Sequence, residues 1–435
     1  MIDVPLAAWW EVISAARWFG GKGLAAELIE VAPLPWLTPA DTLPAVRPEI
    51  ATIDYESGRQ ERYLLLVGYT ANPRSPVLTQ ADVPGHGLLS VVEAPADPDC
   101  MRALLAALVD PAHPAMQWVD ADAIDATAPT KVWAGEQSNT TICLGDDRLF
   151  KLFRKLEPGR NLDVEVLGAL NGSGITPDLY GTLVADLPGA GQVDLGMFVE
   201  RVQGVTDGWE WACQACLDGR SIADEAGRLG AALLAVHQRL AEAFRNGSEP
   251  GEEVAELIRQ RLHVAQAEVS ELNAVASSVE LALRGLDGAE LTTQRVHGDF
   301  HLGQVLYADT GWTIIDFEGE PLKSLAERRR PDSVWRDVAG MLRSFDYVRG
   351  VHPEPASEQA VGWSAEAAEA FLNGYCQGAD PDRAALDAYV LDKAIYEVMY
   401  ETRNRPHWVH IPLGAVHEVA RRTALSPTPN TPKEK

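Results

Sequence analysis

The chain has 435 residues, of which 46% are hydrophobic and 23% are charged, and its formal net charge is −26. This composition is typical of a globular protein and excludes a disordered one, while the length predicts two or three domains. The strong negative charge, without a basic stripe to reverse it, argues against a nucleic-acid or anionic-membrane partner. No apolar run approaches the roughly 20 residues that a helix needs to cross a bilayer.

The expected location is cytoplasmic. The start of the chain, Met1 to Pro5, lacks the basic residues and the apolar stretch of a signal peptide. Five cysteines are scattered along the chain, and the close pair Cys213 and Cys216 has no second pair or neighbouring His that would complete a metal site. Burial of this pair is the simpler interpretation, and unpaired cysteines fit a reducing compartment.

Residues 1–90 alternate short apolar strands with turns. Strands are predicted over 50–55 and 61–69, with a hairpin-type turn at Gly58 between them. The pattern indicates a small N-terminal α+β cap. The glycine-rich stretch 16–23 lacks the spacing of a phosphate-binding P-loop, so a structural turn is favoured there.

Residues 91–204 predict a connecting region followed by a β-rich, nucleotide-binding lobe. Lys151 lies within an apolar strand, which is an expensive place for a charge without a partner. Two partners could stabilise this charge: the α- and β-phosphates of a nucleotide, which the lysine would reach, and a Glu on the next helix. We therefore expect Lys151 to bind nucleotide and Glu165, one turn into a helix that begins near Asn161, to pair with it. Asp163 and Lys155 are less favoured substitutes in this pair.

The turn before Lys151 is predicted to cover the nucleotide phosphates. It has one glycine, where a protein kinase has three, so hydroxyls and backbone N–H groups would cradle the phosphates; a plain hairpin turn is the alternative. The apolar segment 196–202 is typical of a hinge between lobes whose backbone binds adenine. Besides Lys151 and Glu165, the expected nucleotide contacts are Gln137, Ser138, Asn139, Thr140, Glu200 and Val202.

From residue 205 to 425 the apolar spacing becomes helical. Residues 223–244 place apolar side chains on one face at steps of three and four, and further helices are expected over 364–375 and 383–403. The Pro- and Thr-rich tail 426–435 is expected to be disordered. A β-rich small lobe followed by a helical large lobe suits a nucleotide bound in a cleft between lobes.

The most informative motif places Asp299 on a short polar loop, Gln304 five positions later, and Asp316 at the exit of a strand. Phosphoryl transfer needs an acceptor hydroxyl aligned with the γ-phosphorus and a group that accepts its proton, which is the role expected for Asp299. Mg²⁺ prefers oxygen ligands, which Gln304 and Asp316 offer. The spacing is typical of protein-kinase-like phosphotransferases, with Gln304 where a protein kinase has Asn. It predicts a small-molecule kinase that uses ATP and Mg²⁺.

The expected acceptor site lies on the helix near the C-terminus, where polar and aromatic side chains recur at steps of three and four. Tyr and Trp beside amides and charges suit a sugar, because flat rings cover C–H faces while polar groups bind hydroxyls. An exposed helix with weak charge pairs is the alternative. The expected substrate contacts are His301, Asp346, Lys393, Glu397, Tyr400, Glu401, Asn404 and Arg405.

These residues resemble the actinobacterial maltokinases, within the wider aminoglycoside-phosphotransferase-like group. The resemblance implies a bilobal protein-kinase-like α+β fold with an N-terminal cap, and phosphorylation of maltose to maltose 1-phosphate for α-glucan synthesis. By likeness, Asp299 is the base, Gln304 and Asp316 hold metal, and Lys151 holds phosphate. Lys393, Tyr400 and Arg405 would contact sugar by the same likeness. The matching segments are 17–22, 135–139, 151–154, 163–166, 297–304, 315–321, 336–341 and 400–406.

Other functions share the core motif. A maltokinase-like kinase could instead inactivate acarbose, which mimics maltose, or phosphorylate an aminoglycoside or an amino sugar such as glucosamine. A non-catalytic module that binds nucleotide or sugar is an alternative of another class. That class is disfavoured because Lys151, Asp299, Gln304 and Asp316 are all present.

Overall fold

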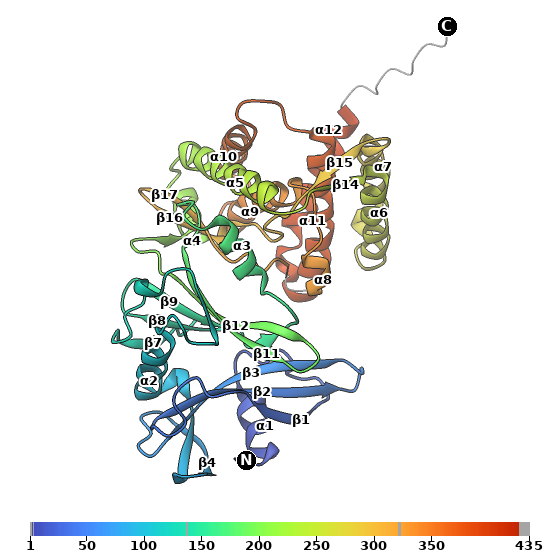
Figure 1. The fold of residues 1–435 in the computed structure, drawn as a ribbon. Helices are drawn as coiled ribbons and strands as arrows, with labels where there is room; N and C mark the ends of the chain where they lie inside the picture. Colours follow the sequence, from blue (N-terminus) through green and yellow to red (C-terminus); the bar gives the residue numbers. More distant parts are fainter. Residues whose placement is uncertain (1, 3, 136–137, 321–322, 426–435) are drawn as a thin grey trace. The chain divides into compact units, whose positions relative to one another are not determined.

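A computed structural model describes residues 2, 4–135, 138–320 and 323–425. The chain forms two compact units. The first comprises Met1–Gly172 and Pro177–Gln203, and the second comprises Ser173–Thr176 and Gly204–Lys435. The expected α+β class is confirmed, since the first unit is built on antiparallel sheets and the second is mainly helical (Figure 1). Within the described ranges, no helix combines the length and hydropathy that a bilayer-spanning segment requires.

The first sheet of the first unit has the strand order β1-β2-β3-β5-β4, with β10 paired to β3. The central strand β3 is buried on both faces, because α1 (Leu6–Ala15) packs on one face of the sheet and α2 (Pro98–Leu108) packs on the other. Gly68 of β3 allows α2 to approach closely, because a Cβ there would lie 2.5 Å from Cys100 Sγ. The strands are β1 (Ala26–Pro33), β2 (Ala45–Tyr55), β3 (Gln60–Thr70), β4 (Val77–Val83), β5 (Gly87–Glu93) and β10 (Lys155–Leu156).

The second sheet of this unit has the order β6-β11-β12-β9-β8-β7, entirely antiparallel. The helix α3 (Leu162–Leu170) begins after Asn161, whose side chain accepts a hydrogen bond from the Asp163 N–H and so caps the helix. The remaining elements of this region are β6 (Met116–Trp118), β7 (Thr130–Val132), β8 (Thr140–Leu144), β9 (Arg148–Leu152), β11 (Leu179–Leu187), β12 (Gly191–Glu200), η1 (Ala94–Ala96) and η2 (Ala121–Ala123).

Arg154 joins the two sheets of the first unit. Its side chain is 1% exposed and donates to Leu64 O of β3 at 3.1 Å, to Glu93 at the end of β5 at 2.5 Å, and to Thr140 Oγ1 of β8 at 2.7 Å. The Trp18 ring lies 4.9 Å from its guanidinium carbon. A buried cation is stable only with such partners, so Arg154 ties the N-terminal sheet to the lobe that follows it.

The second unit is centred on α11, which packs against α9, α6 and α12, while α5 packs against α10. The buried face of α5 is the one predicted from its apolar spacing, which confirms that helix. The helices are α4 (Gly208–Leu217), α5 (Ala223–Ala243), α6 (Gly251–Glu268), α7 (Ala276–Leu283), α8 (Leu325–Arg328), α9 (Trp335–Val351), α10 (Glu358–Cys376), α11 (Arg383–Asn404) and α12 (His410–Leu425).

Short elements complete the second unit. Two small antiparallel sheets, β13-β16-β17 and β14-β15, connect the helices. They comprise β13 (Thr206–Asp207), β14 (Gly247–Pro250), β15 (Glu290–Thr293), β16 (Val305–Ala308) and β17 (Gly311–Ile314), and the 3-10 turns are η3 (Ser270–Ala274), η4 (Arg284–Leu286), η5 (Leu302–Gln304) and η6 (Pro406–Trp408).

Candidate active site

The loop that carries Asp299 is held by a buried carboxylate from α9. The N–H groups of His297 and Gly298 donate to the two oxygens of Asp337 at 2.7 and 2.8 Å, and His237 Nε2 lies 2.9 Å from the same carboxylate. Burial would raise the pKa of Asp337, but the hydrogen bond with His237 and the positive potential of the neighbouring histidines leave that pKa below its ordinary value. Asp337 therefore stays ionised and fixes the backbone just before Asp299.

Asp299 faces a lysine from a helix distant in sequence. Lys393 Nζ of α11 lies 3.2 Å from Asp299 Oδ1, and His301 Nε2 lies 3.9 Å from Oδ2. Burial raises the pKa of Asp299, yet the charge of Lys393, joined by that of His301 when its ring is protonated, outweighs burial and places the pKa below its usual range. The carboxylate is therefore ionised at neutral pH and can accept a proton.

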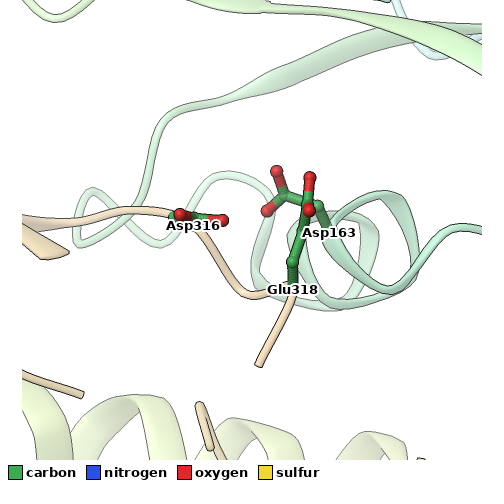
Figure 2. Close-up of side chains that lie close together, drawn as sticks. All are labelled: Asp163, Asp316 and Glu318. Carbon is green, nitrogen blue, oxygen red and sulfur yellow. The ribbon is translucent and has the colours of Figure 1, made fainter. Parts of the chain in front are cut away.

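Gln304 and Asp316, the expected metal ligands, lie together. The Gln304 amide donates to Asp316 Oδ2 at 3.2 Å. Asp316 and Glu318 lie on the loop after β17 (Figure 2), with carboxylate oxygens within 4.8 Å of each other. Asp316 has φ = 64°, a left-handed backbone that is strained for a residue with a side chain and is typical of functional loops. An all-oxygen donor set of this kind suits Mg²⁺.

A cavity of about 660 Å³ opens beside Asp299, and all its lining residues belong to the second unit. Its volume lies within the roughly 300–1,000 Å³ typical of small-molecule sites. Five aromatic rings contribute to the wall, and the Arg405 guanidinium lies 5.4 Å from the Tyr400 ring and 4.3 Å from the Trp408 ring. The lining residues are Trp209, Asp299, His301, Gly303, Glu320, Gly340, Ser344, Tyr347, Lys393, Tyr396, Glu397, Tyr400, Glu401, Arg405 and Trp408.

Residues 129–389 match the model of the APH family, described as the phosphotransferase enzyme family. The chain belongs to that family. Two similar proteins are glucosamine kinases: one from Streptacidiphilus jiangxiensis is 30% identical, with 64% of this chain and 70% of the relative covered. The other, from Mycolicibacterium smegmatis, is 26% identical, with 65% of this chain and 77% of the relative covered.

A solved structure confirms the fold of this phosphotransferase. A glucosamine kinase in complex with glucosamine, ADP and inorganic phosphate has a TM-score of 0.67 and 22% identity, covering 94% of this chain and 99% of that structure. A second crystal form gives a TM-score of 0.65. The expected aminoglycoside-phosphotransferase-like, protein-kinase-like fold is therefore confirmed, and the chain is a phosphotransferase.

The expected acceptor residues divide into two groups. Two of them lie outside the cavity lining described above. Asp346 pairs with Arg343 at 2.5 Å, and the exposed Asn404 amide donates to Tyr400 O at 2.8 Å. Those that line the cavity are His301, Lys393, Glu397, Tyr400, Glu401 and Arg405.

Most charged side chains of the cavity are held in ion pairs. Glu397 lies 2.9 Å from Arg343, which is 1% exposed. The Glu401 carboxylate accepts from Nη2 and Nε of Arg405 at 2.7 and 2.8 Å and from the Tyr347 hydroxyl at 3.0 Å. Glu397 and Glu401 therefore shape the wall by fixing these arginines.

Several cavity residues were not expected from the sequence. Trp209 comes from α4, and Tyr347 comes from α9, where it follows Gly340 and Ser344 at helical steps. That spacing is the one signal that could have identified the α9 face. Tyr396 lies one turn before Tyr400 on the same helix, between positions that were expected.

In the first unit, Lys151 pairs with Asp163, the less favoured of the two partners expected for it. The expected pairing with Glu165 stays a prediction. Lys151 Nζ lies 2.9 Å from Asp163 Oδ2. Asp163 lies at the start of α3 (Figure 2). Glu165 lines a separate cavity of about 380 Å³ with Trp118, Arg160 and other side chains. Asp163 and Glu165 are two residues apart on α3, so their side chains point in different directions.

The expected phosphate-covering turn lies only partly within the described residues. Gln137 falls outside them. Asn139 Oδ1 accepts from the backbone N–H of Arg154 at 3.2 Å, and Thr140 Oγ1 accepts from its side chain. Ser138 is exposed.

The expected hinge, segment 196–202, comprises the second half of β12 and the two residues after it. Glu200 is the last residue of that strand, and its carboxylate accepts from the Asp178 N–H at 3.3 Å. Val202, two residues later, is half-buried. The roles expected for Glu200 and Val202 in nucleotide binding remain predictions.

Proposed function

We propose that this phosphotransferase is a sugar kinase that transfers the γ-phosphoryl group of ATP to a hydroxyl of a neutral oligosaccharide, with maltose as the leading candidate and maltose 1-phosphate as its product. The observation that carries the proposal is the aromatic cavity that opens directly beside the ionised Asp299. Aromatic rings with interspersed polar groups are the surface that sugars bind.

The chemical step follows from this placement. The acceptor hydroxyl donates a hydrogen bond to Asp299, its oxygen forms a bond to the γ-phosphorus, and the bond from that phosphorus to the β–γ bridging oxygen breaks to release ADP. The hydroxyl proton passes to the Asp299 carboxylate. Gln304 and Asp316 would hold Mg²⁺, which neutralises phosphate charge when bound. Lys151, held by Asp163, is proposed to bind the nucleotide phosphates.

The charges of the cavity favour a neutral acceptor. The lining carboxylates are Asp299, Glu320, Glu397 and Glu401. Each carboxylate has a cationic partner. The pairs are Asp299 with Lys393 at 3.2 Å, Glu320 with Lys323 at 3.4 Å, Glu397 with Arg343 at 2.9 Å, and Glu401 with Arg405 at 2.7 Å. A bound ammonium group would compete with these cations, and a like charge near Lys393 would be repelled. An amino sugar or aminoglycoside is therefore a poorer fit than maltose.

An amino sugar kinase is the second candidate. The observation in its favour is similarity, because the relatives described above are glucosamine kinases. Acarbose, which mimics maltose, is a further candidate acceptor, and its phosphorylation would inactivate it.

Release of ADP, measured with Mg-ATP and each acceptor in turn, tests the proposal. Maltose should give a kcat/KM at least about tenfold above glucosamine and kanamycin, since a misplaced like charge costs more than ~1.4 kcal/mol. A kcat/KM for glucosamine above that for maltose would favour the amino sugar kinase, and efficient turnover of acarbose would favour an inactivating kinase. No turnover of any acceptor would favour the non-catalytic module.

A further inference from the structure

Lys393 stands out because a helix far from the catalytic loop supplies it. It lies 94 residues from Asp299 in the chain, yet its Nζ is 3.2 Å from Asp299 Oδ1. The two side chains are 28% and 19% exposed. Within the described ranges, the other cationic side chain paired with Asp299 is His301, whose Nε2 is 3.9 Å from Oδ2. Lys393 is thus the nearest permanent cation to the proposed base.

The ammonium group is held in place by its helix. The residues that follow it on α11, Ala394, Ile395 and Val398, are fully buried, and Glu397, one turn later, is anchored to Arg343 at 2.9 Å. Burial of this face fixes the phase of α11 and so directs the Lys393 side chain toward the carboxylate. The Tyr396 ring lies 5.9 Å from its Nζ and limits movement on that side.

We propose that Lys393 is a positioning residue for Asp299: it keeps the carboxylate ionised and holds one of its oxygens while the other receives the acceptor proton. The proposal rests on the proposed phosphotransfer from ATP. Its physical basis is that an enclosed carboxylate without a cation tends to take up a proton, and a protonated Asp299 cannot accept a second one. A lysine that only binds sugar would affect acceptor affinity instead.

The other charged groups near Asp299 do not replace Lys393. His297 and His301 approach from the same loop, Glu397 lies on α11, and Glu320 acts on Lys393 from the loop after β17. The α9 side contributes Tyr347 to the lining. Burial lowers the pKa of His301, so its imidazole is mainly neutral near pH 7 and supplies little positive charge.

Loss of the Lys393 charge should lower activity most at acid pH. Burial raises the pKa of Asp299, and Lys393 is the largest opposing influence. Removing its charge should therefore raise the pKa of Asp299, so that activity at acid pH is lost first. The acid limb of the profile of kcat/KM against pH should move upward by about one to three pH units.

The test compares Lys393→Met and Lys393→Gln with the wild type, using ADP release with maltose across pH 4.5–9. Both variants should show the upward shift, with the largest loss of rate below neutral pH, and Lys393→Arg should restore the wild-type limb. Lys131→Met, at an exposed lysine of the first unit, is the matched control. Two substitutions at one position guard against a folding defect, which circular dichroism would reveal.

A second arm uses Asp299→Asn, which removes the titrating group. In that background Lys393→Met should cost less than about threefold, because the two residues act as a unit. A loss that is equal at every pH, or that appears only in the KM for sugar, would overturn the proposal. The wild-type rate, measured first, tests the proposed function separately, so the two failures are distinguishable.

Discussion

Asp299 is the residue on which the proposed chemistry depends. Asp299→Asn keeps the shape of the side chain but removes the proton acceptor, so kcat should fall by at least ~10² while the KM for sugar changes little. Release of ADP with maltose measures both constants. Asp309→Asn, at an exposed position ten residues later, is the matched control. Near-normal turnover in the Asp299 variant would remove this residue from the mechanism.

Asp337 should make stability depend on pH. Because its folded pKa is held below the ordinary value, it contributes stability that is present above its unfolded pKa of ~3.9 and is lost as the pH falls through the lower folded value. Asp337→Asn should therefore lower the urea midpoint at pH 6, and the difference from the wild type should shrink near pH 3.5. A difference that stays constant over this range would show that the ionised form is not required.

At the residue scale, the sequence predicted the catalytic motif because its members lie within one short stretch. Asp299, Gln304 and Asp316 span 18 residues, and their spacing alone indicates chemistry. Asp337 was missed since it is a buried polar side chain that acts on a loop 40 residues away. Asp163 pairs with Lys151 at 2.9 Å although it was the less favoured partner, because the phase of a short helix cannot be read from its sequence.

The C-terminal part of α11 and the turn after it form the wall of the acceptor cavity. Tyr400→Ala removes a ring from this wall and should raise the KM for maltose about tenfold, in line with the stacking of one aromatic ring, while leaving the KM for ATP unchanged. Arg403→Ala, on the same helix but paired with Glu268 at the surface, should leave both constants unchanged. An equal rise in both constants for Tyr400→Ala would place the acceptor elsewhere.

At the element scale, helices were easier to predict than strands. The apolar steps of three and four in α5 and the mixed face of α11 are visible in the sequence because one face of each helix is buried. The strands predicted over 50–55 and 61–69 lie within β2 and β3, although β3 is buried on both faces and shows no clear alternation. The partners β1, β4 and β5 were not predicted, since pairing between strands leaves no local signal.

At the scale of the molecule, the N-terminal sheet and the following lobe should behave as one unit. Arg154→Met would leave Glu93 without its cation and Leu64 O without its donor, and should lower the free energy of unfolding by about 3 kcal/mol. Urea unfolding measures this change. Arg102→Met, at an exposed surface pair with Asp99, should cost less than about 1 kcal/mol. Equal stability of the two variants would mean that the sheets do not depend on Arg154.

The cavity of the second unit and its ionised carboxylate lead to one central claim, that this phosphotransferase moves a phosphoryl group from ATP to a neutral sugar. The most direct measurement is ³¹P NMR of the enzyme with Mg-ATP and maltose. We expect a new sugar-phosphate resonance that grows in step with ADP and couples to a proton of the sugar ring. Two results together would contradict this claim. With maltose, ADP would accumulate only alongside inorganic phosphate, or not at all; with glucosamine, a sugar phosphate would form.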